Sequence, residues 1–227
     1  MARQSDSNGR APLTKHAIVT AARKIISTEG HETLTLRGIA TDLGVTAPAL
    51  YAHFENKEEL LRAVVHNEFE WSIAVEWGNS VAHIEDPVDR LRALAYRYVA
   101  FARENPQLFR LLLTYPPEFF RRENFEATER PTSLGGRAFR ATAGAVWGAI
   151  ESGRFRYDDP FLVSLILFSA GHGLAVFLLI EPDLGGEFER RFIDSFIDVL
   201  FRGLAADSTR KRSSSLPDAR LATDSSV

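Results

Sequence analysis

The stretch TLRGIATDLGVTAPALYAHF, residues 35–54, contains the pattern that decides the fold. Two short helices that meet at a steep angle need a small residue where their backbones approach, and Ala40 suits that position. The tight turn between them needs a residue that tolerates positive φ, which Gly44 supplies. The helices are expected at about 36–43 and 47–53. The stretch therefore predicts a helix-turn-helix.

The side chains of this stretch divide into an inward set and an outward set. The inward set is apolar and is expected to form the core shared by the two helices: Ile39, Leu43, Val45, Leu50 and Phe54. The outward set of the second helix is small or hydrogen-bonding: Thr46, Ala47, Pro48, Ala49, Tyr51, Ala52 and His53. A slim helix with such side chains fits the major groove of DNA, where base edges are read.

Helices are also predicted on both sides of this motif. Thr14 is a favoured N-cap for the preceding helix, and Gly30 is expected to end it. Asn56 is expected to cap the following helix, with Glu59 completing a capping box, and that helix is expected to reach Trp77.

The rest of the chain continues as helices with few interruptions. A break is expected at Gly78–Ser80, and residues 118–131 are charged and irregular. Further helices are expected at about 87–103, 106–113, 132–152, 160–180 and 187–206. The predicted fold is all-α, with a helix-turn-helix domain at 13–60 and a larger helical domain at 61–206. Residues 1–12 are predicted to be a flexible arm and residues 207–227 a disordered tail.

One apolar run, residues 161–180, is about long enough to cross a bilayer. Ser164, Ser169 and His172 lie within it, and His172 would sit deep in lipid. A helix that is apolar all round is equally suited to a protein core or a subunit interface. Burial is the favoured interpretation, with no membrane partner.

Composition narrows the class of protein further. The chain has no cysteine, which removes disulfide scaffolds and thiolate chemistry, and its polar N-terminus lacks the apolar core of a signal peptide. A cytoplasmic protein is therefore expected. The net charge is −3, and residues 1–54 carry six basic and four acidic side chains. Charge alone does not indicate DNA binding.

Catalytic and metal-binding patterns are not evident. The sequence lacks a glycine-rich phosphate loop, a Gly-x-Ser-x-Gly elbow and paired histidines at helical spacing, and its six histidines are scattered. No catalytic residue, metal site or cofactor is therefore expected, and the chain is not expected to be an enzyme.

Residues 36–61, with the run LYAHFENKEEL, resemble the DNA-binding domain of tetracycline-repressor-like (TetR) regulators. The resemblance extends over about 14–61. It implies that Lys57 touches a phosphate and that Tyr51 and His53 contact backbone or base edges. The full set of residues expected at DNA is Thr35, Arg37, Thr46, Ala47, Pro48, Ala49, Tyr51, His53 and Lys57. The alternative is that the threonines and Asn56 are caps, Tyr51 is packing and His53 only faces solvent.

The second half resembles one TetR subgroup, whose C-terminal domain is named for a Trp, a His and a Gly. The similarity lies in residues 98–112 and in His172–Ala175, although Phe168 stands where that domain has its Trp. The resemblance implies a helical domain that binds a small effector and forms a homodimer. The helices at 160–180 and 187–206 would pair with their symmetry mates in a four-helix bundle.

The candidate effector-binding residues are mostly aromatic: Tyr98, Phe101, Phe109, Leu112, Phe139, Trp147, Phe168 and His172. Because no charged side chain stands out among them, a mostly apolar or aromatic effector is expected. The alternative for each ring is plain core packing.

The expected function is a repressor that binds a palindromic double-stranded DNA operator as a dimer and is released by the effector. The competing functions are a helical protein-interaction adaptor without DNA binding and a small-molecule enzyme.

Overall fold

The computed structural model describes residues 12–68, 76–115, 135–181 and 183–206, with the side chains of 135–141 left out. Within these residues the chain is helical and forms no β-strand, apart from one isolated antiparallel bridge between Phe155 and Ala205. The all-α prediction is confirmed. Residues 1–11 of the predicted arm, the irregular segment at 118–131 and the tail at 207–227 lie outside the described residues.

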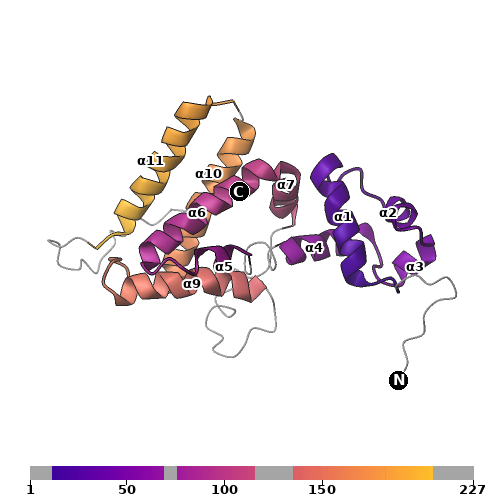
Figure 1. Ribbon diagram of the computed structural model, residues 1–227, viewed down its shortest axis with the longest axis horizontal. Helices are drawn as coiled ribbons and strands as arrows, with labels where there is room; N and C mark the ends of the chain where they lie inside the picture. Colours follow the sequence, from indigo (N-terminus) through magenta and orange to yellow (C-terminus); the bar gives the residue numbers. More distant parts are fainter. Residues whose placement is uncertain (1–11, 69–75, 116–134, 182, 207–227) are drawn as a thin grey trace, which may run out of the picture.

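Four helices pack together at one end of the molecule, on the right of Figure 1: α1 (Lys15–Glu29), α2 (Leu36–Leu43), α3 (Ala47–Tyr51) and α4 (Lys57–Glu68). Their ends follow local chemistry. The Thr14 hydroxyl accepts a hydrogen bond from the Ala17 N–H at 3.1 Å and caps α1, which ends at Gly30 with φ +87°. Asn56 accepts from the Glu59 N–H, and the Glu59 carboxylate accepts from the Glu55 N–H.

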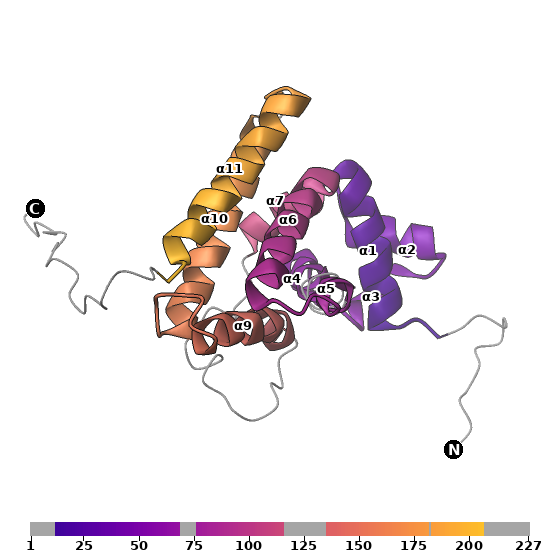
Figure 2. The same ribbon diagram turned by 60° about the vertical axis from the view of Figure 1, so that its left-hand side comes forward.

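Six further helices lie in the described residues of the larger part: α5 (Gly78–Val81), α6 (Pro87–Glu104), α7 (Pro106–Thr114), α9 (Gly135–Glu151), α10 (Pro160–Ile180) and α11 (Gly186–Leu204). Helix α6 packs on α9 and α10, while α7 turns back from the end of α6 toward α1 and α4 (Figure 1). Figure 2 shows α11 running along α10, with the upper ends of both helices extending beyond α6 and α9.

The predicted break at Gly78–Ser80 is wrong, because these residues form part of α5. Trp77 and Val81 on either side are buried. Their burial outweighs the weak helix propensity of glycine and asparagine in between. The chain instead turns at 82–86, where Asp86 caps α6 by accepting hydrogen bonds from the N–H groups of Val88 and Asp89.

One hydrophobic core runs from the first four helices into the larger part. It joins Ile18 of α1 and Leu60 of α4 to Phe101 of α6, Phe109 of α7 and Ala175 of α10, together with their neighbours. A second core, around Val146 and Phe201, joins the first turns of α6 and α10 to the last turns of α9 and α11. The continuous core crosses the domain boundary proposed at residues 60 and 61.

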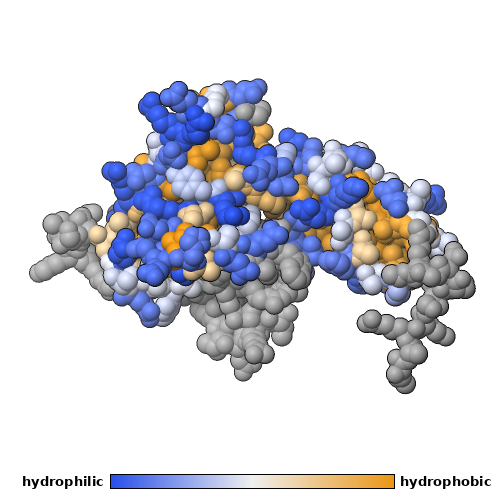
Figure 3. Space-filling view, in the orientation of Figure 1, coloured by the Kyte–Doolittle hydropathy of each residue, from blue (hydrophilic) through white to orange (hydrophobic). Residues whose placement is uncertain are grey.

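Helix α10 is long and apolar enough to cross a membrane by length and composition, and only 28% of its most apolar stretch is buried within one chain. Large apolar side chains are exposed on α10 and on the neighbouring α11. They are Leu162, Phe177 and Ile180 on α10 and Phe188 and Val199 on α11. Figure 3 shows hydrophobic surface between these two helices.

Candidate nucleic-acid interface and effector site

Helices α2 and α3 form the predicted helix-turn-helix. Gly44 adopts the left-handed conformation at φ +62° and ψ +37°, and its N–H bonds back to the Ala40 and Thr41 carbonyls. Ala40 is buried, as the close approach of the two helices requires. Ile39, Leu50 and Phe54 are fully buried, and Leu43 and Val45 pack against them. The predicted turn and core are confirmed.

The outward set of α3 faces solvent to different degrees. Thr46, Pro48, Tyr51 and Ala52 are exposed, whereas Ala47, Ala49 and His53 are half-buried. Tyr51 is 50% exposed, which speaks against a purely packing role. Thr46 occupies the N-cap position, yet its hydroxyl makes no capping hydrogen bond. Hydrogen-bonding groups on α3 are therefore available to a partner.

The remaining candidate DNA contacts lie at the start of α2 and at the start of α4. The Thr35 hydroxyl accepts from the Gly38 N–H at 3.0 Å and therefore does cap α2, while Arg37 is exposed beside it. The Lys57 ammonium donates to the backbone carbonyl of Glu32 at 2.9 Å. This bond ties the first residue of α4 to the loop between α1 and α2, with two ammonium protons left to bind an anion.

Six rings from the larger part meet where α6, α7 and α10 cross, and we call them the aromatic cluster: Trp77, Tyr98, Phe101, Phe109, Phe168 and His172. Tyr98 lies at its centre, 5.7 Å from the Phe109 ring centroid and 5.9 Å from that of Phe168. His172 stacks on Phe168 with centroids 5.2 Å apart and planes 22° apart.

The Tyr98 hydroxyl and His172 Nδ1 share a hydrogen bond of 2.7 Å inside this cluster. Burial raises the pKa of Tyr98 and lowers the pKa of His172, because removal from water disfavours the charged form of each group. Both side chains are therefore neutral at pH 7, and the cluster has a polar but uncharged point at its centre.

The structure brings together Tyr98, Phe101, Phe109, Phe168 and His172 from the predicted effector site, and Leu112 is buried in the adjoining core. Trp147 is not part of the cluster: its side chain is 53% exposed on α9. Phe139 lies on α9, but its side chain is outside the described residues.

Trp77 also belongs to the cluster, although the sequence pattern did not predict it there. Its centroid lies 5.7 Å from Phe101 and 6.2 Å from Tyr98. Its position could have indicated this role, because Trp77 is an aromatic residue at the predicted end of the long helix that follows the helix-turn-helix.

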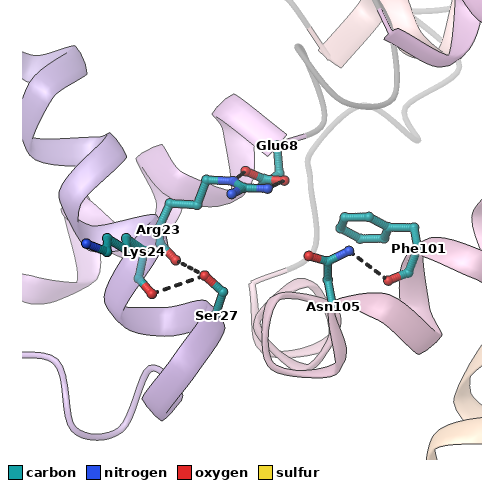
Figure 4. Close-up of polar contacts among 6 residues, drawn as sticks. All are labelled: Arg23, Lys24, Ser27, Glu68, Phe101 and Asn105. Atoms are coloured by element: carbon teal, nitrogen blue, oxygen red, sulfur yellow. Dashed lines mark hydrogen bonds and ion pairs between the residues drawn. The ribbon is translucent and has the colours of Figure 1, made fainter.

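An ion pair with a buried carboxylate links α1 to α4. Figure 4 shows Arg23 of α1 extended to the carboxylate of Glu68, the last residue of α4, opposite Phe101 and Asn105 at the end of α6. Glu68 has only 3% of its side chain exposed. The guanidinium offsets part of the cost of burying this carboxylate, and the pair joins the end of α4 to α1. Nothing in the local sequence pattern indicated this contact.

Across the described residues, no group of three or more His, Cys, Asp or Glu side chains is placed to hold a metal ion.

Several known proteins are similar to this chain in sequence or in fold. An uncharacterised helix-turn-helix-type transcriptional regulator of Mycobacterium tuberculosis is 28% identical over 207 residues, covering 88% of this chain and 84% of the relative. The structure of a protein of unknown function from Rhodococcus sp. RHA1 has a TM-score of 0.66 at 23% identity, with 89% of this chain and 100% of that chain covered. RolR in complex with resorcinol has a TM-score of 0.61 at 17% identity, with 90% and 95% covered.

Two family models match the sequence directly. The model for bacterial regulatory proteins of the tetR family matches residues 18–64, which contain the helix-turn-helix. The model for the tetracycline-repressor-like C-terminal domain matches residues 91–207, just over half of the chain. The Trp-His-Gly subgroup stays a prediction. The chain belongs to the TetR family of bacterial regulatory proteins, a family of transcriptional regulators rather than enzymes.

Proposed function

We propose that this protein is a cytoplasmic transcriptional repressor that binds a palindromic operator as a homodimer and is released by a small effector. The observation that carries the proposal is the geometry of α2 and α3. Gly44, in the left-handed conformation, sets the turn. At the start of α3 the Thr46 hydroxyl makes no capping hydrogen bond, and Tyr51 at the end of α3 is exposed. Side chains of this kind on the second helix read base edges in the major groove.

Further contacts in the DNA complex would fix the position of the protein without reading sequence. Lys57 and Arg37 provide exposed or partly exposed positive charge next to α3. Contacts of this type go to phosphates and supply affinity that depends on salt. Thr35, Ala47, Pro48, Ala49 and His53 complete the proposed interface.

The dimer is proposed to form through α10 and α11. Their shared outer face carries exposed leucine, isoleucine, valine and phenylalanine side chains, which is unusual on the surface of a monomeric soluble protein. A second copy related by a two-fold axis would cover this face with the same face. It would also present two α3 helices to the half-sites of a palindrome.

The effector is proposed to bind at the aromatic cluster. Phe101, Phe109 and Phe168 provide apolar rings around the Tyr98–His172 hydrogen bond. Helix α7 carries Phe109 on this side and packs against α1 and α4 on the other. A ligand that shifts α7 would change the placement of α3, with a coupling of about 1–3 kcal/mol between the two sites.

Operator selection tests this function. Purified full-length protein is incubated with a pool of random duplexes, and the bound DNA is amplified and sequenced over several rounds. We expect an enriched palindrome that competes at least about 1,000-fold better than scrambled duplex at physiological salt. Enrichment of no sequence over scrambled DNA would show that the protein does not read DNA sequence, in favour of the adaptor alternative.

A further inference from the structure

The polar pair in the aromatic cluster restricts the chemistry of the effector. A cluster built only for stability has no need of a tyrosine hydroxyl and an imidazole, because each must lose water on burial. Here the two groups satisfy each other through the 2.7 Å bond between the Tyr98 hydroxyl and His172 Nδ1.

This bond leaves hydrogen-bonding capacity unused. With the tyrosine O–H donating to Nδ1, the neutral imidazole carries its proton on Nε2. Among the described residues, none forms a hydrogen bond with Nε2. The tyrosine oxygen also retains a lone pair that can accept a hydrogen bond. The pair therefore offers one donor, the Nε2–H of His172, and one acceptor, the Tyr98 oxygen. A ligand hydroxyl can accept from the first and donate to the second.

The surroundings of the pair favour an uncharged aromatic ligand. Phe168 and Phe109 pack on the imidazole with centroid distances of 5.2 and 5.4 Å. Aromatic pairs at such distances attract one another, so these faces favour an aromatic partner over an aliphatic one. Tyr98 and His172 are both neutral, so an ionised ligand would lose its hydration without gaining an opposite charge.

We propose that the Tyr98–His172 pair is the polar recognition point of the effector site and that the effector is an uncharged aromatic molecule bearing a hydroxyl group. The inference rests on the proposed function and specifies its ligand. Phenol is the smallest probe with these properties.

A ligand series on the unaltered protein provides the first test. Binding of phenol, toluene and benzoate is measured by calorimetry at pH 7, and the affinity for the selected operator is measured with and without each compound. We expect phenol to bind and to weaken operator binding. Toluene, which lacks the hydroxyl, should bind about 3- to 10-fold more weakly. Benzoate, which is ionised, should bind more weakly than phenol.

Two tyrosines on α6 provide a matched pair of variants for the second test. Tyr98→Phe removes the hydroxyl bonded to His172, whereas Tyr96→Phe removes an exposed hydroxyl that bonds to Asp194 on α11 at 2.8 Å. We expect Tyr98→Phe to weaken phenol binding about 3- to 10-fold and to leave toluene binding unchanged. Tyr96→Phe should behave as the unaltered protein with both compounds.

The outcomes separate this inference from the function on which it rests. Equal binding of phenol and toluene, or unchanged phenol binding in a folded Tyr98→Phe variant, overturns the proposed recognition point. Should Tyr98→Phe fail to fold, the ligand series on the unaltered protein decides alone. A protein that selects an operator but does not respond to phenol refutes only the ligand class. One that selects no operator refutes the function.

Discussion

The Lys57 ammonium donates a hydrogen bond to the Glu32 carbonyl, so α4 begins with a lysine held against the loop that follows α1. The bond restricts the side chain before any DNA arrives. A restricted ammonium loses less conformational entropy when it contacts a phosphate than a free lysine would. This position fits a contact that orients the protein without reading bases.

Lys57→Ala is expected to weaken binding to the operator and to random duplex by similar factors, because a phosphate contact carries no sequence information. The slope of log affinity against log salt should fall by about 1. Fluorescence anisotropy over a range of salt concentrations measures both. Arg110→Ala, which removes an exposed charge on α7, should change neither. A loss on the operator alone would assign Lys57 to base reading instead.

Tyr51→Ala and His53→Ala are expected to act differently from Lys57→Ala. Loss of a contact to a base edge costs about 1–3 kcal/mol and relaxes the preference at the contacted position. Repeating the operator selection with each variant would reveal which base position loses its preference. If both variants keep the original preference and weaken all duplexes alike, α3 touches only the DNA backbone.

Val199→Glu is expected to convert the protein from dimer to monomer. Val199 is 70% exposed on the outer face of α11, where a partner copy would bury the introduced carboxylate without a counter-charge. Light scattering after size exclusion gives the mass directly. Leu113→Glu, which alters an exposed apolar side chain on α7, serves as the control and should stay dimeric. A monomeric unaltered protein would exclude the proposed interface.

Gly44→Ala is expected to lower the free energy of unfolding by about 1–2 kcal/mol, because a Cβ is disfavoured in the left-handed conformation at φ +62°. Gly144→Ala is the matched substitution on α9, where a Cβ meets no other atom within 4 Å. It should raise stability by about 0.5–1 kcal/mol. Urea unfolding compares the two. A neutral Gly44→Ala variant would contradict the role given to this turn.

The pKa of His172 is lowered by burial, so the unfolded chain binds a proton that the folded protein lacks. The free energy of unfolding should therefore fall as the pH drops through the unfolded histidine value of about 6.5, and level off below the folded pKa. His172→Gln should reduce this slope. Burial also lowers the pKa of His66, and the His66→Gln variant measures how much of the pH dependence of stability comes from that residue. Identical slopes with and without His172 would contradict the assignment.

Most helix ends could be predicted because they depend on neighbouring residues. Thr14, Thr35 and Asn56 each accept a hydrogen bond from an N–H three positions later, and Gly44 adopts the positive φ that its turn requires. Such features follow from the sequence within one turn of the helix. The inward face of the helix-turn-helix was predictable for a related reason, since apolar spacing identifies it.

Features set by distant residues could not be predicted in this way. Arg23 and Glu68 are 45 positions apart and meet only because α1 and α4 pack side by side. Trp147 is apolar, yet its position on α9 turns it outward while Val146 enters the core. The helix at Gly78–Val81 forms because Trp77 and Val81 are buried by other elements. Local propensity alone favoured a break there.

The core that continues from α1 and α4 into α6 and α7 has a consequence for folding cooperativity. A fragment cut after Glu68 would expose the apolar faces that Leu108 and Leu111 cover in the whole chain. Each large side chain so exposed would remove about 1.5–3 kcal/mol. The stability of α1 to α4 therefore depends on their packing against the larger part of the chain. A compound that binds and stabilises the larger part would therefore also slow the unfolding of α3, without contacting that helix.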